Sequence, residues 1–223
     1  MHQFVKSLLK DMQALEYMLE NDWFETDPIR IGAEQEMCLV DKSTFKPAPI
    51  AMEVLEKLKD YPWAETELAK FNLEINLDPK VFTGSCIRDI ESEINERTAI
   101  IRKTLKDFNA DLLLTGILPT LRKHDLEIGN LTPKERYFSL IEAIQQELMG
   151  KAFELRLSGI DELLVKHDSA LMEACNTSFQ VHLQVRPAQF VQMYNISQAL
   201  AGPTMAISAN SPLVFGRRLW HES

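Results

Sequence analysis

The sequence predicts an α+β fold in which a mostly antiparallel sheet carries helices packed on one side. Three segments alternate apolar and polar residues with a period of two, which is typical of half-buried strands, and they lie at 29–41, 66–79 and 175–186. Other segments repeat apolar residues at helical spacing, so helices and strands are interleaved along the chain.

The remaining elements, in chain order, follow from their local patterns. Residues 2–20 form an amphipathic helix whose apolar stripe indicates a packing surface. Pro119 ends a buried strand that begins at Asp111. Thr132 is a suitable N-cap for a helix that starts near Pro133. Helices are predicted at 51–60 and 86–109, from Pro133 to about Met149, from Asp161 onward, and from Pro187 to Leu200 or beyond.

Composition indicates an ordinary globular protein, since 223 residues can bury a core as one domain or two small ones. The net charge of −9 disfavours general nucleic-acid binding, which needs a basic surface. Three cysteines without motif spacing favour a reducing cytoplasm over a disulfide framework. We see no segment that predicts a signal peptide or a membrane span, and the eight glycines form no Walker or dinucleotide fingerprint.

The most informative strand carries two carboxylates. Glu34 and Glu36 are two residues apart, so they lie on one face within about 7 Å of each other. Their repulsion is costly unless a cation lies between them, and carboxylates are ligands that suit Mg²⁺ or Mn²⁺. The alternative interpretation is a solvated outer face of an antiparallel strand, which often carries such charges.

Two further strands have polar faces of the same kind. Residues 175–186 place Gln180 and His182 on one face, and neutral imidazole is a common metal ligand. Residues 66–79 place Glu74 on a polar face, with Glu67 seven positions earlier. Three such strands favour a shared site over polar residues that merely face solvent, although the sequence does not show that these faces meet.

These segments resemble the glutamate–cysteine ligases of the plant and bacterial type, which are related to glutamine synthetase. The GAEQE strand at 32–36 resembles the family's Gly-x-Glu-x-Glu strand, and Glu67 and Glu74 match its second pair of carboxylates. Four further segments resemble family motifs in the same order along the chain: TGILP at 115–119, PKERY at 133–137, the strand at 177–183, and ANSP at 209–212.

The resemblance implies a glutamine synthetase-like fold and an ATP-dependent carboxylate–amine ligase of glutathione biosynthesis. Its small-molecule substrates are glutamate, ATP and an amine such as cysteine, and γ-glutamyl phosphate is the intermediate. Divalent cations, Mg²⁺ or Mn²⁺, offset the charge of the anionic groups. The expected metal ligands are Glu34, Glu36, Glu67, Glu74 and His182.

Substrate- or nucleotide-binding roles are expected for four more residues, which are Gln180, Lys134, Arg136 and Asn210. Lys134 and Arg136 would steer negative charge, or else be solvated helix residues. Asn210 would contact substrate, or else only shape an Asn-Ser-Pro turn. No catalytic residue is assigned.

The sequence departs from the family in two ways. The family continues well beyond the position of Ser223, so residues 1–223 are expected to be the N-terminal part of one ligase domain, incomplete and inactive alone. The segment after Asn210 lacks the family's longer Gly-rich form, which leaves the amine open. A pseudoenzyme or interaction protein, a metal-dependent phosphotransferase or hydrolase, and a homo-oligomer also stay open.

Overall fold

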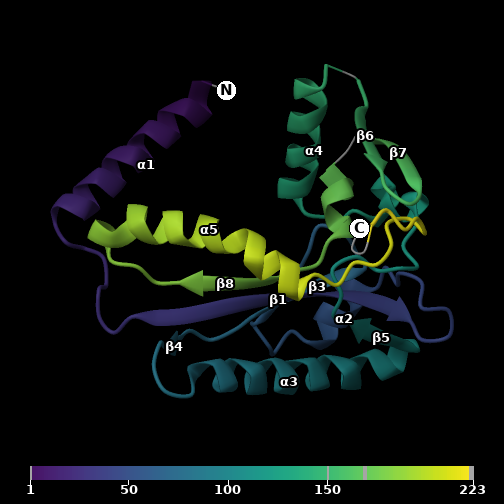
Figure 1. The fold of residues 1–223 in the computed structure, drawn as a ribbon, viewed down its shortest axis with the longest axis horizontal. Coiled ribbons are helices and arrows are strands. Elements are labelled where there is room, and N and C mark those ends of the chain that lie inside the picture. The colour runs from purple at the N-terminus through teal and green to yellow at the C-terminus, as the bar shows by residue number, and fades with distance from the viewer. Residues whose placement is uncertain (1, 150, 168–169, 221–223) are drawn as a thin grey trace.

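The computed structural model describes residues 2–149, 151–167 and 170–220 (Figure 1). Its helices are α1 (His2–Glu20), α2 (Ala51–Lys57), α3 (Cys86–Leu105), α4 (Glu135–Glu147) and α5 (Phe190–Ser208). Its strands are β1 (Arg30–Asp41), β2 (Ala64–Thr66), β3 (Asn72–Asn76), β4 (Lys80–Val81), β5 (Ala110–Leu113), β6 (Phe153–Ser158), β7 (Glu162–His167) and β8 (Phe179–Leu183). Short 3₁₀ segments join them: η1 (Lys106–Phe108), η2 (Lys123–Leu126), η3 (Ile128–Asn130), η4 (Ala170–Cys175) and η5 (Pro187–Gln189).

The main sheet is built around β1, which pairs antiparallel with β3, β4, β5 and β8. Glu34 and Gln35 pair with β3 and β8 at once, so these two strands lie on opposite sides of β1. β2 extends the sheet beyond β3. The predicted α+β class with an antiparallel sheet is confirmed. The helices were predicted on one side, but α2 and α3 pack on one face of β1 and α4 packs on the other.

The alternation of β1 separates two cores. Ile31, Ala33, Met37 and Leu39 point to one face, where they pack with residues of α2 and α3. On the opposite face, Cys38 and Val40 belong to a second core with η4 and the buried side of α4. The polar residues of β1 therefore share their face with a dry apolar region at one end of the strand, which is an environment that raises the cost of a charge.

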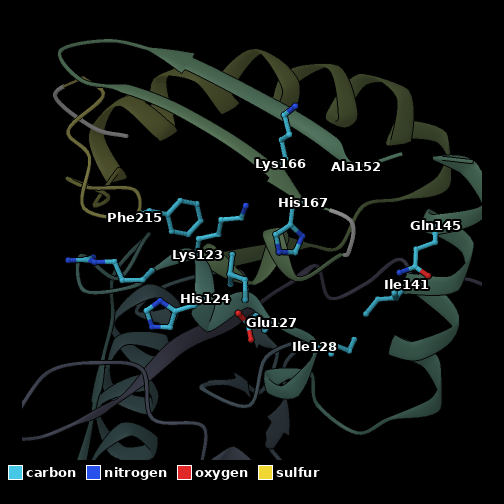
Figure 2. Close-up of a pocket in the computed structure, with 12 residues that line it drawn as sticks. Lys123, His124, Glu127, Ile128, Ile141, Gln145, Ala152, Lys166, His167 and Phe215 are labelled. Atoms are coloured by element: carbon cyan, nitrogen blue, oxygen red, sulfur yellow. The ribbon is translucent and has the colours of Figure 1, made fainter. Parts of the chain in front are cut away.

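The region after α4 corrects one prediction. The helix expected from Asp161 does not form, because residues 162–167 are strand β7, paired with β6 from Phe153↔His167 to Ser158↔Glu162. Burial along β7 alternates strictly between exposed and buried residues, as a half-buried strand requires. The resulting hairpin borders a large pocket, into which His167 points (Figure 2).

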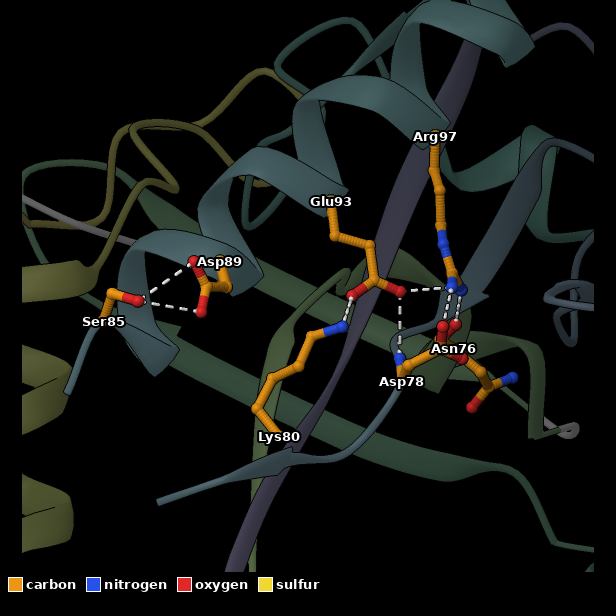
Figure 3. Close-up of polar contacts among 7 residues, drawn as sticks. All are labelled: Asn76, Asp78, Lys80, Ser85, Asp89, Glu93 and Arg97. Atoms are coloured by element: carbon orange, nitrogen blue, oxygen red, sulfur yellow. Dashed lines mark hydrogen bonds and ion pairs between the residues drawn. The ribbon is translucent and has the colours of Figure 1, made fainter. Parts of the chain in front are cut away.

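A partly buried ion-pair network fastens β3 to α3 (Figure 3). Arg97 is only 7% exposed, donates to the carbonyl oxygen of Asn76, and forms ion pairs with Glu93 and Asp78. Glu93 also accepts from Lys80, whose Nζ lies 2.7 Å away. Because a half-buried network of this kind leaves costly unpaired charges when it opens, it holds the end of β3 in place.

Apolar side chains stay exposed at two places. The predicted helix at the N-terminus is confirmed as α1, but its side chains, including Leu8 and Leu9, are largely exposed. α5 runs alongside β8 (Figure 1). Val181, Leu183 and Tyr194 line a groove between these two elements. Within the described residues, none of the helices combines the length and apolarity needed to span a bilayer.

Candidate metal centre

The strand register gathers the predicted polar faces on one side of the sheet. Glu36 pairs directly with Glu74 on β3, and Glu34 pairs with Gln180 on β8. His182 pairs with Gly32, two residues before Glu34. Directly paired residues in antiparallel strands point to the same face, so side chains far apart in sequence become neighbours.

Three of the predicted carboxylates form a compact group, which we call the acidic cluster: Glu36, Glu67 and Glu74. Each offers one oxygen atom, and these oxygens all lie within 4.8 Å of one another. All three residues are half-buried. Glu36 and Glu74 come from adjacent strands, whereas Glu67 comes from the loop directly after β2.

Backbone and amide groups fix the carboxylate of Glu36. It accepts a hydrogen bond from the backbone N–H of Ser178 at 2.7 Å and another from Nε2 of Gln180 at 3.2 Å. Asn76 donates to Oε1 of Glu74 at 3.3 Å. Gln180 is thus placed at the acidic cluster, where its amide orients Glu36.

Thr132 orients Glu67 instead of capping a helix. Its fully buried side chain donates from Oγ1 to the backbone carbonyl of Glu67 at 2.6 Å. Oε2 of Glu67 accepts from the N–H of Leu68 at 2.9 Å. Helix α4 begins at Glu135, with Lys134 at the N-cap position, so the predicted capping role of Thr132 is wrong. The loop position of Glu67 is held from both its main chain and its side chain.

The acidic cluster carries an electrostatic cost. Burial raises the pKa of Glu74 to about 7, and the neighbouring charges of Glu34, Glu67 and Glu36 act in the same direction. Burial, with the charge of Glu36 adding to it, also raises the pKa of Glu67. A divalent cation would offset this repulsion, and a donor set of three carboxylates suits a hard, oxygen-seeking ion such as Mg²⁺ or Mn²⁺.

Glu34 and His182 border the cluster. Nε2 of His182 lies 3.5 Å from Oε1 of Glu34, and more than half of the His182 side chain is exposed. The charge of Glu34 contributes to the raised pKa of Glu74. These two residues therefore extend the polar face along β1 and β8, next to the three carboxylates.

The predicted cationic residues lie at the start of α4. Arg136 is exposed, and its charge interacts with Glu67 and Glu65. Its Nη2 donates to the hydroxyl oxygen of Tyr137 at 2.5 Å, and the guanidinium lies 4.6 Å from that ring's centroid. Lys134 is half-buried, and its side chain makes no hydrogen bond or ion pair within the described part of the chain.

Asn210 is tied to a different feature, the Thr115–Gly116 turn. Its backbone carbonyl accepts from the N–H of Gly116 at 2.7 Å and from Oγ1 of Thr115 at 3.0 Å. The carbonyl of Gly116 in turn accepts from the N–H of Thr177 at 2.8 Å. The described contacts of Asn210 serve this junction, and none of them reaches the acidic cluster.

The close approach at this junction predicts the effect of Gly116→Ala. An added Cβ would lie 3.0 Å from the Asn210 carbonyl oxygen and 3.3 Å from the Ser211 Cβ. Either segment must shift, so we expect a loss of about 1–3 kcal/mol in the free energy of unfolding, measured by urea denaturation. Gly129→Ala is the matched control, because no atom lies within 4 Å of its added Cβ. Equal effects of the two substitutions would contradict a packed junction.

The structure adds one acidic residue that the sequence did not single out. Burial raises the pKa of Glu173 in η4, and the charges of Glu67 and Glu36 add to that shift. Glu173 therefore lies close enough to the acidic cluster to feel its charge, and it comes from η4 and not from a sheet strand. A 3₁₀ segment has no strand or helix periodicity by which this placement could be predicted.

Two buried thiols belong to the second core, which contains Cys38 and Cys175. Burial raises the pKa of Cys38 to about 11 and that of Cys175 to about 12. Sγ of Cys38 lies 3.9 Å from Oγ1 of Thr177. Both thiols stay protonated at neutral pH, so neither is suited to act as a nucleophile.

The protein has an α+β fold whose antiparallel sheet presents clustered carboxylates on one face. Such a scaffold is suited to cation-assisted chemistry on anionic substrates. Residues 30–223 match glutamate–cysteine ligase family 2, and the chain belongs to this family. Membership implies a carboxylate–amine ligase that uses ATP and small-molecule substrates. No curated protein shows a significant match to the chain.

Proposed function

We propose that the protein joins the γ-carboxylate of glutamate to an amine, with cysteine as the default amine, at the expense of ATP. A free carboxylate is a poor electrophile. Its oxygen therefore first takes the γ-phosphoryl group of ATP, which forms γ-glutamyl phosphate and releases ADP. The amine nitrogen then attacks the acyl carbon, inorganic phosphate leaves, and the nitrogen loses a proton.

The observation that carries this proposal is the acidic cluster. Three half-buried carboxylates with oxygens within 4.8 Å of one another are costly to hold together without a cation. Glu36, Glu67 and Glu74 would hold Mg²⁺ or Mn²⁺, and Glu34, Glu173 and His182 lie around them. When bound, a divalent cation supplies positive charge against the triphosphate and the transferring phosphoryl group.

Other residues of the chain orient the carboxylates of the acidic cluster or would bind the anionic groups of the substrates. The amide of Gln180 and the N–H of Ser178 hold the Glu36 carboxylate, so they keep it in one orientation. Arg136 offers a guanidinium beside Glu67, held by its contact with Tyr137, where it would attract the anionic groups of glutamate or ATP. Lys134, at the N-cap of the same helix, would add a second positive charge.

The experiment that tests the reaction is phosphate release by protein made from its complete natural coding sequence, with glutamate, ATP, Mg²⁺ and a panel of amines. We expect release to depend on both glutamate and an amine, with cysteine giving the highest rate. The coupled product should gain the mass of glutamate less one water. Release that needs no amine would identify a phosphohydrolase and contradict the proposal.

A pseudoenzyme would give a different pattern. It would bind the cation at the acidic cluster and yet release no phosphate with any amine. Phosphate release that depends on an amine other than cysteine would still identify a ligase, and it would change only the proposed amine substrate.

A further inference from the structure

A second site lies apart from the acidic cluster. It is a pocket with a volume of about 1220 Å³, bounded by η2, η3, α4, the end of β7 and the segment around Phe215. None of the residues that line it belongs to the acidic cluster or surrounds it. We call it the basic pocket, because of the side chains described next.

Five side chains that carry or can carry positive charge line the basic pocket, against one carboxylate, Glu127. The five are Arg122, Lys123, His124, Lys166 and His167. Figure 2 shows that Lys123, His124 and His167 come from two separate segments and gather around one opening. The whole chain has 24 basic residues against 33 acidic ones, so this concentration of positive charge opposes the overall balance.

The contacts of these side chains differ, and Nε2 of His124 lies 3.4 Å from the carboxylate of Asp125. Lys123 makes no ion pair within the described part of the chain. Lys166 points to the opposite face of β7 from His167, away from the other basic side chains (Figure 2), and its Nζ lies 3.1 Å from Oε2 of Glu154. Nη1 of Arg122 donates to the carbonyls of Pro119 and Leu121, which fixes the guanidinium in place without neutralising it.

The rest of the wall is apolar. Leu126, Ile128, Ile141 and Phe215 contribute to it, and Ile128 is 57% exposed. An apolar wall beside a few convergent charged groups is typical of small-molecule sites. Lysine and arginine are the side chains that most often bind phosphate.

We propose that the basic pocket binds a small organic phosphate, with the phosphate group against Lys123 and Arg122 and the organic part against Ile128, Ile141 and Phe215. The positive charges of Arg122 and Lys123 favour an anion, and the apolar wall favours an anion that carries an apolar part. This site does not depend on the ligase reaction or on a cation in the acidic cluster.

Isothermal titration calorimetry of phenyl phosphate into the protein, in buffer with EDTA, tests the proposal. EDTA removes divalent cations, so a failure of the acidic cluster to bind metal would not affect the result. We expect phenyl phosphate to bind, and phenol and inorganic phosphate each to bind at least about tenfold more weakly. Inorganic phosphate binding as tightly as phenyl phosphate would contradict a role for the apolar wall.

Paired substitutions locate the binding. Arg122→Gln with Lys123→Gln should weaken phenyl phosphate binding at least about tenfold. Lys59→Gln with Lys103→Gln removes the same charge at exposed positions outside the pocket and should leave binding unchanged. Thermal melts establish that each variant is folded before titration. No binding to the wild-type protein, or equal weakening by both pairs, would overturn the proposal.

Discussion

Glu36→Gln is expected to lower ligase activity and affinity for Mg²⁺ or Mn²⁺ by at least about a hundredfold. Glu36 contributes one of the three clustered oxygens, and a neutral amide is a much weaker ligand for a hard cation. Steady-state rates of the complete protein, together with Mn²⁺ titration, measure both effects.

The stability of this variant separates a ligand from a structural residue. The substitution removes one negative charge from a repelling group, and the amide oxygen can still accept from the N–H of Ser178. We therefore expect the free energy of unfolding without metal to change by no more than about 1 kcal/mol. Glu65→Gln is the matched control. Glu65 lies on β2 and pairs with Glu74 of β3, but it is exposed and does not belong to the acidic cluster. Unfolding of Glu36→Gln, or normal metal affinity, would contradict the account.

The second large effect is a pH dependence of stability that originates at Glu74. The pKa of Glu74 is about 7 in the folded protein, above the ordinary value of 4.5. Between these two values the folded state keeps a proton that the unfolded state releases. The stability that this proton provides is present at low pH and is lost as pH rises towards and through 7. In EDTA, the melting temperature of the wild-type protein should therefore fall between pH 5 and pH 8 more than that of Glu74→Gln.

Glu67 and Glu173 have raised pKa values too, so a smaller fall should remain in the Glu74→Gln variant. Adding Mg²⁺ at pH 8 should restore stability to the wild-type protein, because the cation favours the ionised carboxylates. Metal affinity should decrease as pH falls below 7, since a proton then competes at Glu74. If the melting temperatures of wild type and Glu74→Gln changed equally with pH, the pKa of Glu74 would not be raised by its surroundings, and the prediction would be wrong.

The sequence predicted much of this arrangement because strand alternation is a local property. The period of two placed Glu34 and Glu36 on one face of β1, and the structure places Gln180 and His182 on the same side of the sheet. The pairing of β1 with β3 and β8 was not predictable, because strand neighbours depend on contacts between residues far apart in the chain. The fixing of Glu67 by Thr132 is of this long-range kind.

The errors have equally physical causes. The stretch after Asp161 was predicted as a helix, although Leu163 and Val165 alternate with exposed residues in β7. The turn around Gly159 separates two such runs, and it was the local signal for a hairpin. Glu173 was missed because a 3₁₀ segment leaves no periodic trace, and the basic pocket was missed because its side chains come from separate segments.

The most direct measurement is a crystal structure of the protein soaked with Mn²⁺, using anomalous scattering to locate the metal. We expect a Mn²⁺ ion bound to carboxylate oxygens of Glu36, Glu67 and Glu74, and loss of that ion in crystals of Glu36→Gln. A fully occupied ion elsewhere, or no ion at the acidic cluster at Mn²⁺ concentrations that support activity, would contradict the central claim.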